Sequence, residues 1–342
     1  MEIHPTSPEN TPRAPKKQNP VTPAMVTDAQ SAADQVGVTP DELAAIYLLD
    51  SVKYLGPQAF KELHEAGCPP SDACKNPELL PTKGKRGDKI RKQLAVEVQQ
   101  DQKIFRDRAV RQILAAHKHG AHIVTYRHPS YPRNVYKSNY PAPVLYVRGS
   151  LRVLGAEKTV ACVGTRKIRL PYSNWEDDFV RLACSRGFTI ISGFALGADS
   201  IGHETAWKTR GETVCVMPGG LDRPFPPENR SLWNGLLEYP SAAFVTESPF
   251  GATASSLTLR KRNKLIVAFS RGVLVAQSSA KGGAMNAYRF AIEQGKPVAT
   301  FSADDSADTS GNSKISEYSN AEVLKSEPEA FERWLKKLSS SI

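Results

Sequence analysis

The fold is decided by residues 159–199, which read TVACVGTRKIRLPYSNWEDDFVRLACSRGFTIISGFALGAD. Thr159–Val163 and Thr189–Ser192 are short apolar runs of strand length, and Tyr172–Arg186 between them has the spacing of an amphipathic helix. Gly187 falls between this helix and the second strand, the position at which a left-handed residue ends many helices. A strand, a helix and a strand in this order predict a parallel βαβ unit.

The same alternation of elements continues toward the C-terminus. Short apolar strands that alternate with amphipathic helices predict a parallel sheet with helices on both faces. The fold class is therefore α/β, a doubly wound Rossmann-like parallel sheet over residues 121–302, preceded by a small helical domain. The further strands are expected at Thr213–Met217, Ala243–Thr246, Val273–Ala276 and Pro297–Phe301, and the further helices at Asp199–Arg210, Glu228–Leu237, Lys261–Phe269 and Ala284–Gln294.

Three segments flank this sheet domain. Residues 1–36 are rich in proline and lack apolar periodicity, so we expect a disordered N-terminal segment. Residues 37–120 begin with Thr39-Pro40, a helix-start signal, and continue in short amphipathic runs, which predict the helical domain. Residues 303–342 are expected to form a polar linker and one amphipathic helix over Ala321–Leu338.

Composition narrows the class of protein. The 342 residues include 45 Lys and Arg against 35 Asp and Glu, and the net charge of +10 favours a polyanionic partner. Five cysteines without a repeated spacing fit reduced thiols in the cytoplasm better than a disulfide framework. Neither a secretory leader nor an apolar run of membrane-spanning length is present, so we expect a soluble cytoplasmic protein without a membrane partner.

Glycine and basic residues follow several of the predicted strands. In an open α/β sheet, ligands bind at the carboxyl ends of the strands. Glycine there lets backbone N–H groups approach an anion, and arginine offers a planar fork for phosphate. The sequence therefore predicts a phosphate-bearing ligand, and the candidate binding residues are Gly164, Thr165, Arg166, Lys167, Ser192, Gly193, Arg223, Lys261, Arg262 and Asn263.

Each of these features also has a purely structural interpretation. The glycines could serve tight turns alone, and the basic run that contains Arg262 could be a solvated helix face. His203 stands four residues after Asp199, a spacing that suits either acid–base chemistry or the stabilisation of a helix start. The Walker A, dinucleotide-binding and nucleophile-elbow motifs are missing, and no cluster holds a complete set of metal ligands. We therefore expect no catalytic residue, cofactor or metal.

The strand-end loops, in this order, resemble those of the DprA/Smf family of bacterial DNA-processing proteins. The resemblance extends from about Ile123 to Phe301, and the residues before it look like the family's SAM or helix-hairpin-helix-like domain. The matching stretches are Tyr131-Pro132, Pro143–Gly149, Val163–Arg166, Ser192–Asp199 with His203, Gly220–Asp222, Pro226–Arg230, Glu247–Pro249, Arg262–Ile266 and Gly272–Val275.

The resemblance implies an extended Rossmann fold that binds single-stranded DNA in a basic pocket, dimerises, protects incoming strands and assists RecA loading during transformation. It implies no catalytic reaction. The chain departs from the family pattern where Leu196 replaces an arginine and Leu259 replaces a phenylalanine, so that one basic side chain and one possible stacking ring are absent.

Two alternatives stay open. One is a small-nucleotide-binding enzyme or sensor of the LOG-like Rossmann class, with a role in phage defence, for which Asp222 and Glu247 would be the residues to test. The other is a protein-interaction scaffold built on the N-terminal segment and the C-terminal helix.

Overall fold

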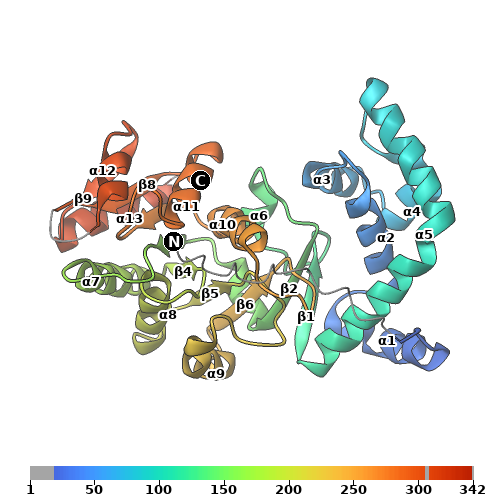
Figure 1. The fold of residues 1–342 in the computed structure, drawn as a ribbon, viewed down its shortest axis with the longest axis horizontal. Helices are drawn as coiled ribbons and strands as arrows, with labels where there is room; N and C mark the ends of the chain where they lie inside the picture. The colour runs from blue at the N-terminus through green and yellow to red at the C-terminus, as the bar shows by residue number, and fades with distance from the viewer. Residues whose placement is uncertain (1–18, 305–307, 341–342) are drawn as a thin grey trace, which may run out of the picture.

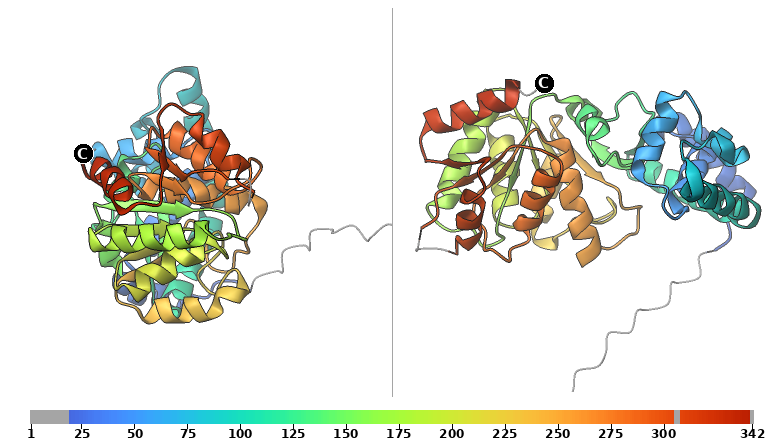
Figure 2. Two further views of the ribbon diagram at one scale, coloured as in Figure 1. Left: turned by 90° about the vertical axis from the view of Figure 1, so that its left-hand side faces the viewer. Right: turned by 90° about the horizontal axis from the view of Figure 1, so that it is seen from above.

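The computed structural model describes residues 19–304 and 308–340. Within these residues, a group of five helices stands beside one sheet that carries helices on both faces (Figure 1; Figure 2). The five N-terminal helices are α1 (Pro23–Val36), α2 (Pro40–Ser51), α3 (Pro57–Glu65), α4 (Pro70–Lys75) and α5 (Gly84–Lys118).

The sheet has nine strands in the described part of the chain, in the order β1-β2-β6-β5-β4-β3-β7-β8-β9. The strands from β6 to β9 in this order are parallel, whereas β2 pairs antiparallel with β6, and β1 with β2. The predicted doubly wound α/β class is confirmed, with two antiparallel strands at one edge. The strands are β1 (Ala121–Thr125), β2 (Val144–Gly149), β3 (Thr159–Val163), β4 (Thr189–Ser192), β5 (Thr213–Val216), β6 (Ala242–Thr246), β7 (Val273–Val275), β8 (Val298–Phe301) and β9 (Ala321–Leu324).

The connections between strands reverse direction beside β3. Going from β3, the chain adds β4, β5 and β6 in turn on one side, and it then returns to place β7 and β8 on the other side. Figure 1 shows α7, α8 and α9, which connect β3 to β6, on one side of the strands, and α10 and α11 on the other. A switch point therefore lies between β3 and β7. The helices are α7 (Tyr172–Ser185), α8 (Ala198–Lys208), α9 (Arg230–Glu238), α10 (Ser256–Phe269) and α11 (Ala284–Glu293), with the short α6 (Arg133–Lys137) before β2.

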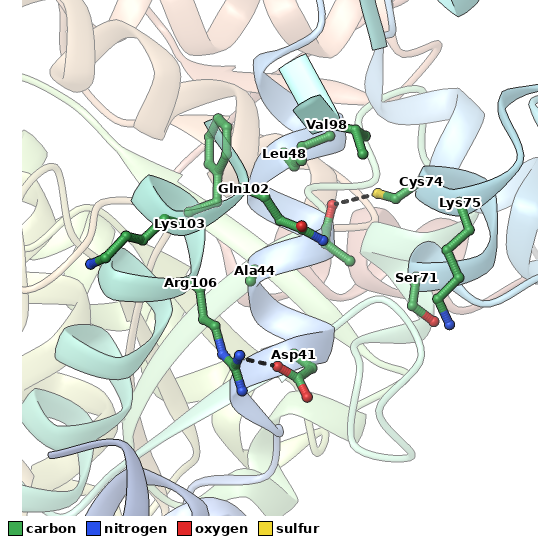
Figure 3. Close-up of a pocket in the computed structure, with 12 residues that line it drawn as sticks. Asp41, Ala44, Leu48, Ser71, Cys74, Lys75, Val98, Gln102, Lys103 and Arg106 are labelled. Carbon is green, nitrogen blue, oxygen red and sulfur yellow. Dashed lines mark hydrogen bonds and ion pairs between the residues drawn. The ribbon is translucent and has the colours of Figure 1, made fainter. Parts of the chain in front are cut away.

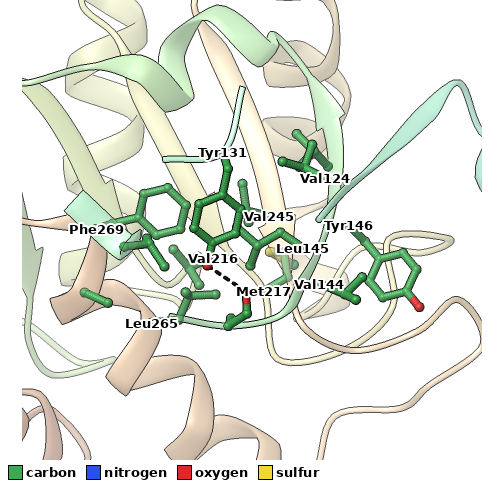
Figure 4. Packing of buried hydrophobic residues seen from close by; sticks show 14 of the residues in the cluster. Val124, Tyr131, Val144, Leu145, Tyr146, Val216, Met217, Val245, Leu265 and Phe269 are labelled. Carbon is green, nitrogen blue, oxygen red and sulfur yellow. Dashed lines mark hydrogen bonds between the residues drawn. The ribbon is translucent and has the colours of Figure 1, made fainter. Parts of the chain in front are cut away.

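Tyr131 ties the segment before β2 into the sheet core. The residue is 7% exposed, and its hydroxyl donates a hydrogen bond of 2.6 Å to the carbonyl of Ala142. Figure 4 shows Leu145, Val216 and Phe269 packed close to this ring. The same core continues into the helical unit, where the Tyr47 hydroxyl of α2 is hydrogen-bonded to that of Tyr146. The helical unit and the sheet therefore share buried surface.

We predicted disorder for residues 1–36, and this prediction is wrong for residues 23–36, which form α1. The side chain of Thr22 accepts a hydrogen bond from the Met25 N–H, Pro23 occupies the first turn, and Gly37 ends the helix with φ 95°. Ala29 and Val36 are fully buried, so the helix has an apolar face to pack. Residues 1–18 lie outside the described residues.

The single helix predicted over Ala321–Leu338 is also wrong. Ala321–Leu324 forms β9, which pairs parallel with β8, and the helix α13 begins only at Pro328 (Pro328–Ser340). Proline suits a helix start but not a helix interior, which explains the break. A further helix, α12 (Ser310–Ser316), lies in the stretch predicted as a linker.

Cys162 and Cys215 are fully buried in β3 and β5, as expected of small core residues. All five cysteines are free thiols. Among residues 19–304 and 308–340, no helix combines the length and apolar character that crossing a bilayer requires.

Candidate nucleic-acid interface

A cavity of about 550 Å³ lies at the switch point, at the carboxyl ends of β3 and β7. This is the place at which open α/β sheets bind ligands. The loop after β3, the loop after β7 and the helix α10 enclose it. Its lining includes Gly164, Thr165, Arg166, Lys167, Asp199, Leu259, Arg260, Arg262, Asn263, Ser278, Ser279, Gly282, Gly283 and Asn286.

Glycines let the loops after β3 and β4 pack against each other. A Cβ on Gly164 would lie 2.7 Å from the Cβ of Ala198, and one on Gly197 would lie 2.4 Å from the Thr165 carbonyl oxygen. Gly197 also has φ +76°, a conformation that favours glycine. These glycines are therefore required by the packing, and they hold the loop of Arg166 in place.

Arg262 reaches the cavity as one member of a buried ion pair. Its Nη1 lies 3.3 Å from Oδ2 of Asp199, and both side chains are 8% exposed. The same Asp199 oxygen accepts a hydrogen bond of 3.1 Å from the N–H of Ala195, so the carboxylate joins α10 to the loop before α8. The Nε of Arg262 is buried and has no partner among the described residues. The guanidinium is therefore fixed in position but not fully satisfied.

The cavity is electropositive. Burial lowers the pKa of Arg262 below its ordinary value; Asp199 opposes this shift and the positive charge of Arg166 adds to it. Arg166 and Lys167 are exposed, and neither forms an ion pair with any described residue. An anion in the cavity would relieve the repulsion between the two arginines.

The first turn of α11 borders the same cavity. Gly282, Gly283 and Asn286 line it, and no side chain caps this helix. The Asn263 amide donates to the carbonyl of Gly283 at 3.3 Å, which ties α10 to this turn. The dipole of a helix favours negative charge at its N-terminus, so α11 adds to the potential of the arginines.

A smaller cavity of about 110 Å³ adjoins the first, since Arg166 and Arg262 line both. Apart from these arginines and Glu228, its lining is mostly apolar. The lining residues are Arg166, Gly193, Ala195, Leu196, Pro218, Phe225, Pro226, Glu228, Leu259 and Arg262. Cationic groups therefore stand at the junction of a polar cavity and an apolar one.

The structure brings most, but not all, of the predicted binding residues together. Gly164, Thr165, Arg166, Lys167, Arg262 and Asn263 line the larger cavity, and Gly193 lines the smaller one.

Three of the predicted residues line neither cavity. The buried Ser192 hydroxyl donates to the Cys162 carbonyl at 2.5 Å. Arg223 pairs with its neighbour Asp222 at 2.6 Å. Lys261 is exposed on α10 outside the cavity, and its charge acts on Asp50 and Glu247.

The sequence missed Ser278, Ser279 and Asn286 as lining residues. The two serines lie in the loop after β7, three and four residues past its end, so the same strand-end argument could have identified them. Helix α10 also starts earlier than the predicted Lys261, at a capping box formed by Ser255 and Thr258.

The residues considered for enzyme chemistry, Asp222, Glu247 and His203, line neither of these two cavities. Asp222 accepts a hydrogen bond from the Gly251 N–H, and half-buried Glu247 accepts one from the Tyr140 hydroxyl. Burial raises the pKa of Glu247 to about 7. His203 is fully buried, and its Nδ1 bonds to the Thr213 hydroxyl rather than to Asp199. Burial also lowers the pKa of His203 to about 3, so its role is in the core.

Another cavity, of about 510 Å³, lies in the helical unit between α2, α4 and α5 (Figure 3). Asp41 and Arg106 form an ion pair of 3.4 Å at its edge, and the Cys74 thiol donates to the Ala45 carbonyl. It shares no lining residue with the cavities at the sheet.

Comparison with known proteins gives a consistent result. The family model of DNA recombination-mediator protein A matches residues 122–334. The Smf protein of Synechocystis sp. is 33% identical over 183 residues, which cover 53% of this chain and 45% of that protein. The DNA processing protein DprA of Bacillus subtilis is 27% identical over 172 residues, covering 50% of this chain and 56% of that protein. The chain thus spans about half the length of these curated relatives.

Two solved structures share the fold. The match to the X-ray structure of DNA processing protein A from Streptococcus pneumoniae covers 86% of this chain and 98% of that protein's chain. Its TM-score is 0.67 at 17% sequence identity. The Helicobacter pylori protein, whose structure addresses its single-stranded DNA binding mode, covers 61% of this chain and 92% of its own, with a TM-score of 0.54 and 23% identity.

Proposed function

Since this chain belongs to the DprA/Smf family of DNA recombination-mediator proteins, we propose that it binds single-stranded DNA in the cavity at the switch point. The observation that carries the proposal is the convergence of Arg166 and Arg262 on one cavity from two different elements. Arginine binds phosphate through a planar fork and can stack on bases, and both uses suit an unpaired strand.

The two adjoining cavities would bind different parts of the DNA strand. We assign the phosphates to the larger cavity, where Arg166, Lys167 and the first turn of α11 supply positive potential. We assign one base to the apolar smaller cavity, beside Phe225 and Leu259. Contacts to phosphate and to the flat face of a base tolerate any sequence, so the binding is expected to be sequence-independent.

The proposal extends to the role that the family resemblance implies. A strand held in this way would be protected, and the protein would assist RecA loading on it during transformation or recombination, acting as a homodimer. The assignment is one of binding, and no reaction is attributed to the residues of the cavity. RecA filament formation on strands coated with this protein, compared with bare strands, tests this part separately.

Salt dependence tests the binding itself. Fluorescence anisotropy is measured with a labelled oligothymidylate and with a duplex of the same length, each across a salt titration. Because phosphate contacts release counterions, affinity for the single strand should fall steeply with salt. The duplex should bind more weakly at every salt concentration, since its bases are not free to enter the smaller cavity. Equal affinity for both, or affinity independent of salt, would contradict the proposal.

A further inference from the structure

A further cavity, of about 280 Å³, lies where the helical unit meets the sheet domain. Helix α3 contributes His64, the loop after β1 contributes residues 126–129 and 131, and α6 contributes three side chains. It shares no lining residue with the two cavities at the switch point. The full lining is His64, Tyr126, Arg127, His128, Pro129, Tyr131, Arg133, Tyr136 and Lys137.

Aromatic rings form one part of this lining. The His64 ring lies 6.0 Å from the ring of Tyr126 and 5.9 Å from that of Tyr136, in both cases nearly perpendicular to it. Tyr131 meets Tyr136 in the same way, with ring centres 6.4 Å apart. Edge-to-face contacts fix the orientation of the rings. The half-buried Tyr136 thus belongs to a rigid aromatic group at an open cavity.

The charged side chains of the lining are all cationic. Arg127 and Lys137 form no ion pair with any described residue, and the exposed pair of Arg133 with Glu157 is 3.3 Å long. No carboxylate is among the described residues of the lining, although Glu65 lies beside it and accepts a hydrogen bond of 3.4 Å from the Tyr136 hydroxyl. The ammonium of Lys61 adds a further positive charge 5.2 Å from the centre of the Tyr136 ring. The chemistry of this lining therefore suits an anion attached to a flat, π-rich group.

Tyr126 is the most deeply buried tyrosine of the lining. The residue is 2% exposed, and its hydroxyl is buried without a hydrogen-bond partner among the described residues. Because this oxygen is closed to solvent, a nucleotide in the open cavity cannot reach it. The lining offers such a ligand its cationic side chains and the half-buried Tyr136 ring. The hydroxyls of the neighbouring Tyr131 and Tyr136 do have partners, Ala142 and Glu65.

We propose that this cavity binds one nucleotide of the same single strand that occupies the switch-point cavity, with its phosphate on Arg127 and Lys137 and its base against Tyr136. The inference rests on the proposed function. Helix α10 connects the two places, because its middle carries Arg262 and Asn263, and the Phe269 carbonyl at its end accepts a hydrogen bond of 3.1 Å from Asn134 of α6. A strand must be long enough to follow this helix before it fills both cavities.

Oligonucleotide length separates the two cavities experimentally. Anisotropy is measured for the full chain with oligothymidylates of about 6 and about 20 nucleotides. The variants are Lys137→Ala and Tyr136→Leu, and Lys314→Ala on α12 is the matched control, since Lys137 and Lys314 are both exposed. The two test variants should weaken binding of the longer strand by about five- to tenfold and leave the shorter strand unaffected. The control should change neither.

Two results would overturn the inference, and they are distinguishable. If Lys137→Ala binds the longer strand as tightly as Lys314→Ala does, the cavity at α6 holds no nucleotide, whatever happens at the switch point. If the wild-type chain binds neither strand, the proposed function itself fails, and this inference fails with it. Because Lys137 is exposed, its replacement tests the cavity without disturbing the core.

Discussion

Arg262 and Asp199 form an ion pair that is buried on both sides, with a distance of 3.3 Å between Nη1 and Oδ2 and 8% exposure of each side chain. The pair joins α10 to the first turn of α8, and Asp199 also accepts a hydrogen bond from Ala195 in the loop that follows β4. It therefore serves two purposes, because it holds the wall of the cavity together and places a guanidinium at the junction of the two cavities.

Replacing only one member of this pair should destabilise the fold. Arg262→Ala leaves the Asp199 carboxylate buried without its counter-charge, and we expect a loss of about 3–5 kcal/mol in the free energy of unfolding. The double variant Arg262→Ala with Asp199→Ala should recover part of this loss. Urea denaturation of the four proteins in the cycle measures the coupling. Additive losses would show that the pair contributes no coupling.

Arg166 is the better probe of binding, because it is exposed and forms no ion pair among the described residues. Arg166→Ala should change stability by no more than about 0.5 kcal/mol. It should weaken single-strand binding about equally for all base sequences, and the slope of log affinity against log salt should fall by about 1. Arg333→Ala, an exposed arginine of α13, is the control and should bind as the wild type does. An unchanged slope in Arg166→Ala would place the strand elsewhere.

Leu259 lines both cavities, at the position where the resemblance to the DprA/Smf family implies a phenylalanine. Leu259→Phe should restore a stacking surface and tighten single-strand binding by about 1 kcal/mol, which is about fivefold. Leu257→Phe is the matched control on the same helix, since Leu257 is 65% exposed and lines neither cavity. Equal effects of the two substitutions would mean that added apolar surface, rather than stacking in the cavity, causes the gain.

Glu176 should make stability depend on pH. Its side chain is fully buried, both carboxyl oxygens lack partners among the described residues, and burial raises its pKa well above 4.5. In the unfolded chain the carboxyl ionises above about 4.5, so between that pH and its raised pKa in the fold the folded state binds one more proton than the unfolded chain. The unfolding free energy should therefore fall as pH rises, by about 1.4 kcal/mol per unit from this group. Thermal or urea unfolding of Glu176→Gln should lack this contribution. An identical pH profile in the variant would refute the assignment.

Much of the sheet domain could be predicted from the sequence because its signals are local. Apolar runs such as Thr159–Val163 and the glycines between elements gave the strands and helices, and the strand-end rule located the loop of Arg166. The helix α1 was missed because the prolines before it dominate the composition, although Thr22-Pro23 is a local helix-start signal. The strand β9 was missed because its four residues fit the apolar spacing of the helix that follows.

Which side chains pair with one another in the site depends on contacts between residues far apart in the chain, and a single sequence does not show these contacts. Asp199 and His203 lie on one turn of α8, and that spacing drew attention to the wrong pair. The actual partner of Asp199 is Arg262, 63 residues later, and that of His203 is Thr213 in β5. Ser192 and Arg223 were predicted from their positions after strands, but their side chains bond to Cys162 and Asp222 instead.

The most direct test of the central claim is a crystal structure of the full chain with a bound oligothymidylate. We predict a phosphate between the Arg166 guanidinium and the first turn of α11, with an unpaired base directed into the cavity beside Phe225 and Leu259. An ordered strand on any other surface, with the cavity at the switch point empty, would contradict the account.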